Sequence, residues 1–518
     1  MHISIHSFRR KRTLVAAFLI LLLTAAAQEP GDTYTMLQEG FHRPPDSARP
    51  RTWWHWTNGN VTMEGITKDL EWMKAVGIAG FQLADVAFGM GQEIDEKRFF
   101  MSPEWLDAVR HAAEEADRLS LEMSMFSSAG WSLTGGPWVK PEQAMKKAVW
   151  SRTAVSGPGR VHDTLPVPPS NIGPIRDLNR GGRPGPSAAF YRDQLVVAFP
   201  TPPDAQGDAA LKPGSAGRPV HGGDQGHGDQ PARSGDPVII TSAGPMDTSP
   251  LTDQSLNTSV TLPGTADQSP AWIQFSYERP VTVRSFSIAS RQGIPFGRVL
   301  ASEDGISFRT LVTLPGTQNY RPGTVRTYSV PETTAPVFRL EMSGAPPQPA
   351  EVMAETPPAY PEAFTLSECK FHSLARIHRW EDKAGFSLQF EYGSTPTPEA
   401  SPGSIVPGDR VIDLTGHMDE NGVLDWNVPE GDWTILRMGY SLTGAQNRPA
   451  VAAGLGYEVD KLNEDHTRAY LEGYFGPLEE KLGPLVGNPL QYLMLDSWEA
   501  GMQNWTDDMV EEFRERRG

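Results

Sequence analysis

The sequence predicts an α/β fold built around a parallel β-sheet, and three observations support this prediction. Between about residues 50 and 155, short apolar runs alternate with helix-type patterns in the order β-α-β-α-β. The same alternation returns after about residue 430, whereas the segment in between reads as strands and turns. Helical crossovers between strands are typical of parallel sheets, which occur in closed barrels or in open, doubly wound folds.

The first α/β segment contains a local signal for each of its helices. Thr62 and Ser102 are N-cap residues, and Pro103 favours the first position of the second helix. Apolar residues at helical spacing follow both caps. The expected elements are a strand at 53–56, a helix at 62–77, a strand at 78–85, a helix at 102–119 and a strand at 121–126.

The middle of the chain is predicted to be an all-β insertion. After a short helix expected at 142–148, the chain reads as strands until about residue 440. Residues 204–235 are rich in Gly, Asp, Gln and Pro, and we expect them to be disordered. Residues 236–345 contain "WIQFSYERPVTVRSFSI", "VLASEDGISFRTLVTL" and "VFRLEMSG", which resemble a galactose-binding-like β-sandwich. Such a module either binds sugar on its loops or serves a structural role.

The α/β pattern returns in the last part of the chain. We expect a strand at 433–440, a helix at 464–474, a strand at 492–495 and a helix capped by Thr506. The count of parallel-type strands is then about five, which is too few to close an eight-stranded barrel. Because the chain stops directly after a helix, we expect it to be part of a longer protein.

The N-terminus predicts export from the cytoplasm. Residues 9–12 are basic, residues 14–23 are apolar and residues 25–27 are alanines, which is the order of a secretory signal peptide. A buried helix or a membrane anchor is the alternative, although the apolar run is short for a full span. We expect cleavage after Ala27 and a secreted or periplasmic protein with no membrane span after cleavage.

Composition disfavours several classes of function. The 518 residues carry a formal net charge of −17, which opposes binding to nucleic-acid phosphates. Cys369 is the single cysteine, so the chain can form neither an internal disulfide nor a metal site built from cysteines. Motifs typical of kinases, dinucleotide oxidoreductases and zincins are missing from the sequence, and Ser132 lies in no nucleophile elbow.

Candidate functional residues gather where the predicted strands end. Reactive groups in parallel α/β sheets lie at the carboxyl ends of the strands. Carboxylates and amides hydrogen-bond sugar hydroxyls there, and indole rings stack on sugar C–H surfaces. The candidates for binding a carbohydrate are His55, Trp56, Asn58, Asp85, Trp131, Glu458, Asp460 and Trp498.

Asp496 and Glu499 are the sharpest catalytic candidates. Both follow the apolar run 492–495 and lie near Trp498 and Trp505 in the sequence. A carboxyl group next to an indole in an apolar pocket has a raised pKa, which suits a general acid. The alternative is that Asp496 caps a turn and that Glu499 lies on the surface.

Glu458 and Asp460 suit a second role. Their hard oxygen ligands fit Ca²⁺ as well as sugar hydroxyls. Because the two acids alternate with Tyr457 and Val459, an ordinary polar strand edge is equally consistent with the pattern. For His55, which lies between tryptophans, contact with substrate and a hydrogen-bonded place in the core both remain open.

Four longer stretches resemble glycoside hydrolase family 106, which contains α-L-rhamnosidases. They are "WWHWTNGNVTMEGITKDLEWMKAVGIAGFQLADV", "AGWSLTGGPWVKPEQAMKKAVW", "GLGYEVDKLN" and "LDSWEAGMQNWTDDMVEEFRERRG", and the match covers about residues 37–155 and 430–518. The resemblance implies a (β/α)₈ TIM-barrel catalytic domain, incomplete here and interrupted by the all-β insertion. It further implies removal of terminal α-L-rhamnose from poly- or oligosaccharides with inversion, and calcium as a cofactor.

The resemblance also implies roles for individual residues. Glu499 matches the family's general acid, with Asp496 as a supporting residue, and the general base comes from a later strand that we expect beyond residue 518. The chain departs from the family where Phe126 and Ser127 replace a frequent His-Asn pair. A non-catalytic carbohydrate-binding protein and a barrel glycosidase for another sugar are the alternatives.

The predicted organisation has six parts. They are a signal peptide at 1–27, the first part of the barrel at 28–155, a β-rich insertion at 156–235, the galactose-binding-like sandwich at 236–345, the remainder of the insertion at 346–430 and further barrel elements at 431–518.

Overall fold

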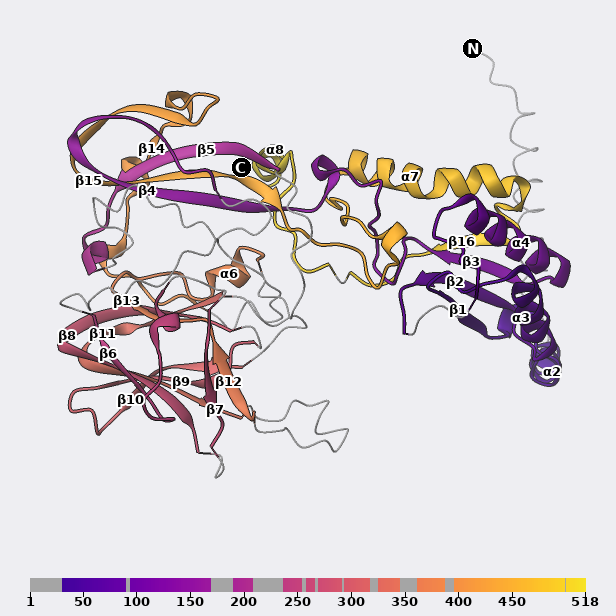
Figure 1. The fold of residues 1–518 in the computed structure, drawn as a ribbon, viewed down its shortest axis with the longest axis horizontal. Coiled ribbons are helices and arrows are strands. Elements are labelled where there is room, and N and C mark those ends of the chain that lie inside the picture. Colours follow the sequence, from indigo (N-terminus) through magenta and orange to yellow (C-terminus); the bar gives the residue numbers. More distant parts are fainter. Residues whose placement is uncertain are drawn as a thin grey trace, which may run out of the picture. The chain divides into compact units, whose positions relative to one another are not determined.

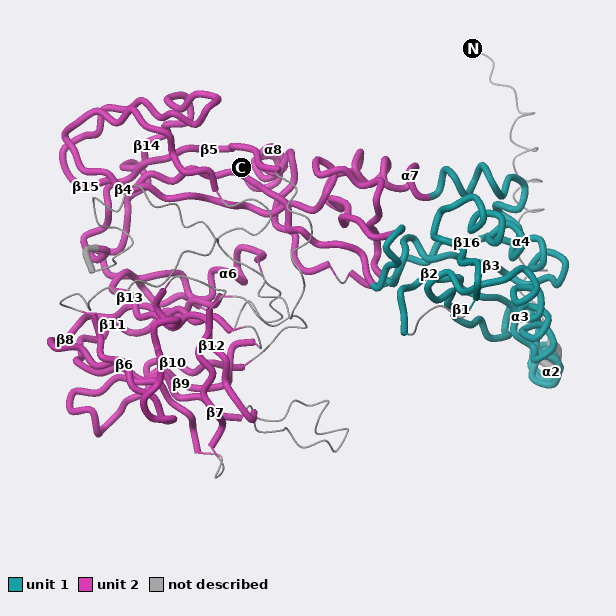
Figure 2. The backbone as a smooth tube through the Cα atoms, viewed as in Figure 1, with its two compact units in different colours: residues 1–131, 449–453, 475–496 teal, residues 132–448, 454–474, 497–518 magenta. Residues whose placement is uncertain are grey.

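The structure is a computed structural model in which the chain divides into two compact units (Figure 2). Unit 1 comprises residues 1–131, 449–453 and 475–496, and unit 2 comprises residues 132–448, 454–474 and 497–518. The described residues are 30–89, 94–168, 190–207, 236–253, 258–265, 269–290, 293–316, 325–344, 361–386, 396–498 and 500–518. The predicted signal peptide and residues 208–235 of the predicted disordered segment lie outside them.

Unit 1 is built on a four-stranded sheet whose paired strands are all parallel (Figure 1). In spatial order the strands are β1 (Arg51–Thr57), β2 (Gly80–Val86), β3 (Glu122–Phe126) and β16 (Leu490–Met494). The predicted parallel sheet is therefore confirmed for this part of the chain. An eight-stranded barrel is not formed by the described residues, which contain these four parallel strands rather than about five.

Two helices connect the first three strands, and both begin at the predicted caps. The Thr62 hydroxyl accepts a hydrogen bond from the Gly65 N–H at the start of α3 (Met63–Ala75). The Ser102 hydroxyl does the same for the Trp105 N–H in α4 (Pro103–Leu119). A further helix, α2 (Pro30–His42), precedes β1.

Side chains alternate between the two faces of this sheet. Trp54, Trp56 and Phe81 lie on the face that packs against the helices, where Trp54 Nε1 donates to Asp69 of α3 at 3.1 Å. The Trp105 ring of α4 meets Trp56 edge-on, with 6.3 Å between the ring centroids. Because successive residues of a strand point to opposite faces, His55, which lies between Trp54 and Trp56, belongs to the other face.

Asp85 lies on the helix-packing face and is buried there. Its Oδ2 accepts a hydrogen bond from Trp105 Nε1 at 3.0 Å, and the side chain is 3% exposed. Within the described part of the chain, neither Asp85 Oδ1 nor the neighbouring Trp56 Nε1 has a hydrogen-bond partner. Burial raises the pKa of Asp85 to about 7, against the smaller opposing effect of the Trp105 hydrogen bond.

Unit 2 contains an antiparallel sheet that combines strands of the predicted β-rich insertion with residues that the sequence assigned to the barrel. Its strands, in spatial order, are β14 (Ile412–Asp413), β5 (Tyr191–Pro200), β15 (Val423–Leu442) and β4 (Lys146–Thr164). The predicted strand at 433–440 lies within β15 and pairs antiparallel with β4 and β5, so its assignment to the parallel sheet was wrong. The direction of a buried strand depends on its partners, and an apolar run alone does not reveal it.

The prediction of a helix at 142–148 was also wrong. Residues Pro141–Gln143 form a short 3₁₀ turn, η2, and β4 begins at Lys146. Lys146 and Val149 are buried near the start of β4, where this strand pairs with the end of β15. The sequence "EQAMKKAVW" therefore leads into the long strand β4. The strand β15 pairs with β4 along nearly its full length.

The second β-layered part of unit 2 is a sandwich of a six-stranded and a two-stranded sheet. The larger sheet contains β6 (Val238–Thr241), β8 (Ala271–Ala289), β9 (Phe296–Ser302), β10 (Arg309–Pro315), β11 (Val325–Ser343) and β13 (Glu368–His372). The smaller sheet pairs β7 (Val260–Pro263) with β12 (Ala363–Leu366). Leu262 and Phe364 join one apolar core with Phe275 and Phe338, so the sandwich continues past the expected end at 345.

Three further α-helices complete the described fold. Trp380–Lys383 form α6, Glu464–Leu482 form α7 and Met509–Arg517 form α8. Asp508 occupies the N-cap position of α8, so the prediction that Thr506 caps this helix was wrong. The Thr506 hydroxyl donates instead to the Asp460 carboxylate. Among the described residues, no helix is both long and apolar enough to cross a membrane.

The buried carboxyl of Asp85 predicts a stability that falls as pH rises. Between pH 4 and 7 the folded protein keeps a proton on Asp85 that the unfolded chain releases, because its pKa is raised from 3.8 to about 7 on folding. We expect the thermal midpoint of unit 1 to decrease across this range, and Asp85→Asn to remove that component. Calorimetry at a series of pH values measures it.

Asp69→Asn is the matched control, because Asp69 also accepts an indole N–H but lies on the exposed side of α3. Equal pH profiles for wild type and Asp85→Asn would show that Asp85 is not the titrating group.

Candidate functional site

The predicted site residues fall into two clusters, one in each unit. The His55 cluster of unit 1 contains His55, Trp53, Trp131 and Phe88. The Glu458 cluster of unit 2 contains Glu458, Asp460, Lys461, Trp498 and Thr134. Each cluster is described by itself.

His55 is held as a hydrogen-bond acceptor by Trp131. The indole Nε1–H of Trp131 donates to His55 Nε2 at 3.1 Å, which requires a free electron pair on that nitrogen. The rings of Trp53 and Trp131 meet the imidazole edge-on at 5.6 and 5.9 Å between centroids. Burial lowers the pKa of His55, so the neutral imidazole is favoured.

Asn58 fixes the loop that follows β1. It adopts the left-handed backbone conformation with φ of 54°, and its Nδ2 donates to the Phe88 carbonyl at 2.6 Å. Phe88 in turn packs on Trp131 with 5.5 Å between ring centroids. The loops after β1 and β2 are thereby joined beside His55.

Strand alternation separates the other predicted unit 1 residues from His55. Trp56 and Asp85 belong to the helix-packing face described above, where both are almost fully buried. The structure therefore places them in the core under α4 rather than beside the indole of Trp131. The sequence argument grouped residues by strand end and did not assign them to faces.

Among the described residues, Glu458 is a buried carboxylate with one hydrogen-bonded oxygen and one oxygen without a hydrogen-bond partner. Its Oε2 accepts hydrogen bonds from the Thr134 hydroxyl and from Lys461 Nζ, the latter at 2.7 Å. The side chain is 1% exposed, yet within the described residues Oε1 has no hydrogen-bond partner. The backbone is fixed on both sides, since the Glu458 N–H donates to the Ala445 carbonyl and its carbonyl accepts from the Met145 N–H.

Lys461 connects this carboxylate to an indole. Its Nζ lies 4.8 Å from the ring centroid of Trp498, and burial lowers its pKa against the opposing effect of Glu458. Trp498 is 47% exposed, and its Nε1 donates to the Gly501 carbonyl at 2.6 Å. A charged pair and a half-exposed indole are thus in direct contact.

Asp460 is fully buried and fully used by hydrogen bonds. Its Oδ2 accepts from Lys146 Nζ at 3.0 Å and from the Thr506 hydroxyl at 2.9 Å. Its Oδ1 accepts from the Gln503 side-chain amide and from the Leu462 N–H. Sequence reasoning did not place Lys146, Gln503 or Thr506 in the site; Lys146 was expected in a helix, whereas it is the first residue of β4.

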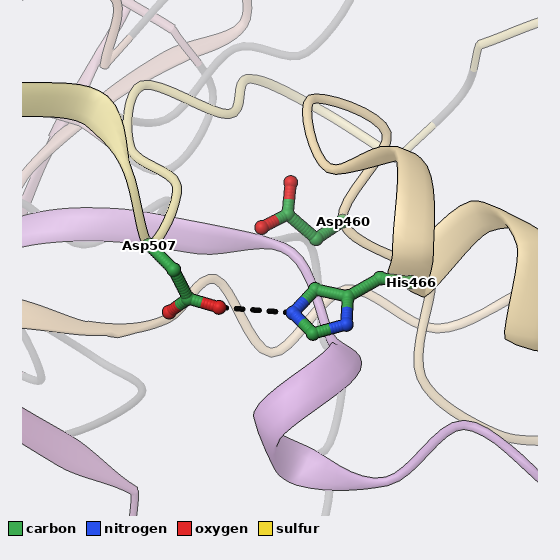
Figure 3. Close-up of side chains that lie close together, drawn as sticks. All are labelled: Asp460, His466 and Asp507. Carbon is green, nitrogen blue, oxygen red and sulfur yellow. Dashed lines mark hydrogen bonds and ion pairs between the residues drawn. The ribbon is translucent and has the colours of Figure 1, made fainter. Parts of the chain in front are cut away.

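Asp460, His466 and Asp507 lie close enough together to be tested as a metal site (Figure 3). His466 Nε2 and Asp507 Oδ2 are 2.9 Å apart. However, the buried ammonium of Lys146 lies 3.0 Å from Asp460 Oδ2 and 3.5 Å from Asp507 Oδ2. Because a cation of the protein already lies between the carboxylates, these residues do not fit a divalent ion.

Glu458 does not complete a calcium site either. Calcium takes six to eight oxygen ligands, whereas Glu458 offers one unused oxygen and has an ammonium on the other. The described residues near Glu458 and Asp460 therefore do not form the calcium ligand set suggested by their sequence spacing.

Of the two catalytic candidates, only Asp496 is among the described residues. Asp496 is half-buried after β16 and is the last residue of unit 1. Ser497 pairs with Ser132 in an isolated β-bridge of unit 2, and Trp498 follows it. Glu499 lies outside the described residues, so its assignment as general acid stays a prediction.

Comparison with known proteins identifies similar chains that are longer than this one. A rhamnosidase from Novosphingobium sp. PP1Y is 35% identical, with a TM-score of 0.70 over 93% of this chain. A curated protein of Formosa agariphila named "Putative beta-glucuronidase" is 26% identical over 505 residues. The chain spans 41% of the first and 27% of the second.

Shorter similarities involve carbohydrate-binding modules. One is the CBM32 of AlyQ in complex with 4,5-unsaturated mannuronic acid, which is 19% identical, with a TM-score of 0.20 over 26% of this chain and 92% of that one.

The family comparison covers nearly the whole chain. The sequence model of glycoside hydrolase family 106, described as alpha-L-rhamnosidase, matches residues 42–518. The match includes both α/β segments and the β-rich part between them. The chain therefore belongs to the α-L-rhamnosidase family of glycoside hydrolases.

Proposed function

We propose that this chain is part of a secreted α-L-rhamnosidase that removes terminal α-L-rhamnose from polysaccharides or glycosides. The family match over residues 42–518 is the observation that carries the proposal. The side chains of unit 2 support it, because an open carboxylate oxygen on Glu458 and a half-exposed indole on Trp498 suit the two kinds of surface on a sugar ring.

The His55 cluster of unit 1, taken by itself, also offers groups that suit a sugar. Its neutral imidazole accepts from Trp131, and Trp53 is about half exposed beside it. In the proposed enzyme, the indole edges and the Nδ1 of His55 contact substrate, while the Trp131 hydrogen bond fixes the tautomer.

The proposed reaction is hydrolysis with inversion. Glu499, as a carboxylic acid, protonates the glycosidic oxygen while the C–O bond breaks, and Asp496 supports it. A second carboxylate removes a proton from the water that attacks the anomeric carbon from the opposite side. We assign this base to the part of the enzyme that this chain does not span, since the solved rhamnosidase is more than twice as long.

A second candidate activity follows from the name of the Formosa agariphila relative. A glycosidase for β-glucuronides would use the same pair of carboxyl groups but would need a cation for the uronate. The complete gene product should be assayed on aryl α-L-rhamnosides and aryl β-glucuronides in parallel. Cleavage of the glucuronide alone would replace the rhamnosidase proposal, and sugar binding without turnover would favour the non-catalytic alternative.

The acid role of Glu499 predicts a selective loss of turnover. We expect Glu499→Gln in the complete enzyme to lower kcat on an aryl α-L-rhamnoside with a poor leaving group by roughly 10²–10⁴-fold, because general acid catalysis is worth about that much. The loss should be smaller for an activated nitrophenyl leaving group, which needs less protonation.

Glu515→Gln, at an exposed position of α8, is the control for the charge change. Unchanged kcat in Glu499→Gln on both substrates would remove Glu499 from the acid role.

We propose calcium as a cofactor of the complete enzyme only on the basis of the family resemblance, and with ligands other than Asp460. Lys146 already neutralises Asp460. We therefore expect Lys146→Met to lower the free energy of unfolding by about 3–5 kcal/mol, since the buried charge of Asp460 is left unpaired.

Denaturant titration measures the Lys146→Met effect, with Lys140→Met at an exposed position as the control. An unchanged free energy of unfolding in Lys146→Met would contradict the assignment of Lys146 as the cation paired with Asp460.

A further inference from the structure

Lys461 is a largely buried lysine whose ammonium contacts Glu458 and Trp498. Its Nζ is 2.7 Å from Glu458 Oε2 and 3.4 Å from both the Val459 carbonyl and Met145 Sδ. Its side chain is 9% exposed. Removing an ammonium from water is costly unless it is paired, so the pair with Glu458 is the main reason that Lys461 remains charged there.

The ion pair between Lys461 and Glu458 leaves one oxygen of the carboxylate without a hydrogen bond among the described residues. A purely structural ion pair does not require such an unused acceptor. Lys461 and Thr134 both donate to the same oxygen of Glu458, and Oε1 remains without a partner among the described residues. A buried acceptor without a partner carries an energetic cost that a ligand hydroxyl would remove. The ammonium also contacts the indole of Trp498, about half of which stays exposed.

We infer that Lys461 is a positioning residue of the sugar site, which holds the Glu458 carboxylate and the Trp498 indole in one arrangement so that Glu458 Oε1 accepts a sugar hydroxyl beside the exposed indole. This inference rests on the proposed function. Trp498 directly precedes Glu499, the proposed acid, in the sequence.

The charge and the shape of Lys461 have separate effects in this arrangement. The positive charge of the ammonium compensates the charge of Glu458, and hydrogen bonds to a charged group are stronger than those between neutral groups. The position of the ammonium over the ring fixes the indole through a cation–π contact. Arg retains both effects in part, whereas Met fills similar volume and retains neither.

Fluorine NMR of the chain labelled with 5-fluorotryptophan tests the inference without relying on turnover. Trp498→Phe identifies the Trp498 resonance by its loss. In Lys461→Met we expect this resonance to shift or broaden, and the response to L-rhamnose to weaken at least tenfold in apparent Kd. Lys461→Arg should restore the resonance position and most of the affinity, and Lys140→Met should change neither.

Each outcome separates the positioning role from the proposed function. A Trp498 resonance that is identical in wild type and Lys461→Met overturns the positioning role, whether or not sugar binds. A resonance that moves in Lys461→Met, in a wild-type chain whose tryptophan resonances do not respond to L-rhamnose, supports the positioning role and contradicts the sugar site.

Glu458→Gln keeps the experiment decisive if Lys461→Met does not fold. This variant preserves the shape of the side chain and removes the charge that holds Lys461. We expect the Trp498 resonance to move in Glu458→Gln as well, and an unmoved resonance would show that Glu458, Lys461 and Trp498 are not coupled.

Discussion

The buried ion pair between Lys146 and Asp460 is the interaction on which the unit 2 site depends. It joins the start of β4 to the extended segment that contains Glu458, and the Thr506 hydroxyl adds the segment before α8. Neither charged side chain is exposed to water. Two charges in such an environment are stable only when their remaining hydrogen-bonding capacity is satisfied, and Gln503 completes the set at Asp460. The pair thus fixes the direction in which the segment presents Glu458.

In the unit 1 sheet, one set of alternating side chains of β1 packs against the helices and the other set lies on the opposite face. Trp54 and Trp56 anchor β1 to the helices, while Trp53 and His55 face the other side. The helix side is almost fully buried and includes the Asp85 carboxyl, whose proton is retained up to about pH 7. A neutral carboxyl avoids the cost of an unpaired buried charge, so this side can be apolar in practice although it contains an acid. The opposite side is left to His55 and its indole donor.

The local parts of the fold could be predicted from sequence, and the parts that depend on distant partners could not. Thr62 and Ser102 cap helices because a cap is decided within four residues, and those predictions were confirmed. The direction of the strand at 433–440 is set by β4, almost 300 residues earlier, and no local pattern contains that information. For the same reason the spacing of Glu458 and Asp460 indicated that the segment was important but not that Lys146, 314 residues earlier in β4, pairs with Asp460 while the nearby Lys461 pairs with Glu458.

Those two lysines explain why adjacent acids in one segment have different chemical capacities. Asp460 receives four donors, so both of its oxygens are saturated and its role is architectural. Glu458 receives two donors on one oxygen, so the same charge compensation leaves an acceptor available. A divalent cation would engage both acids and would compete with any hydroxyl for Glu458. A lysine ammonium compensates the charge of Glu458 from one side only, which leaves the other oxygen as a directional acceptor, as recognition of a single sugar hydroxyl requires.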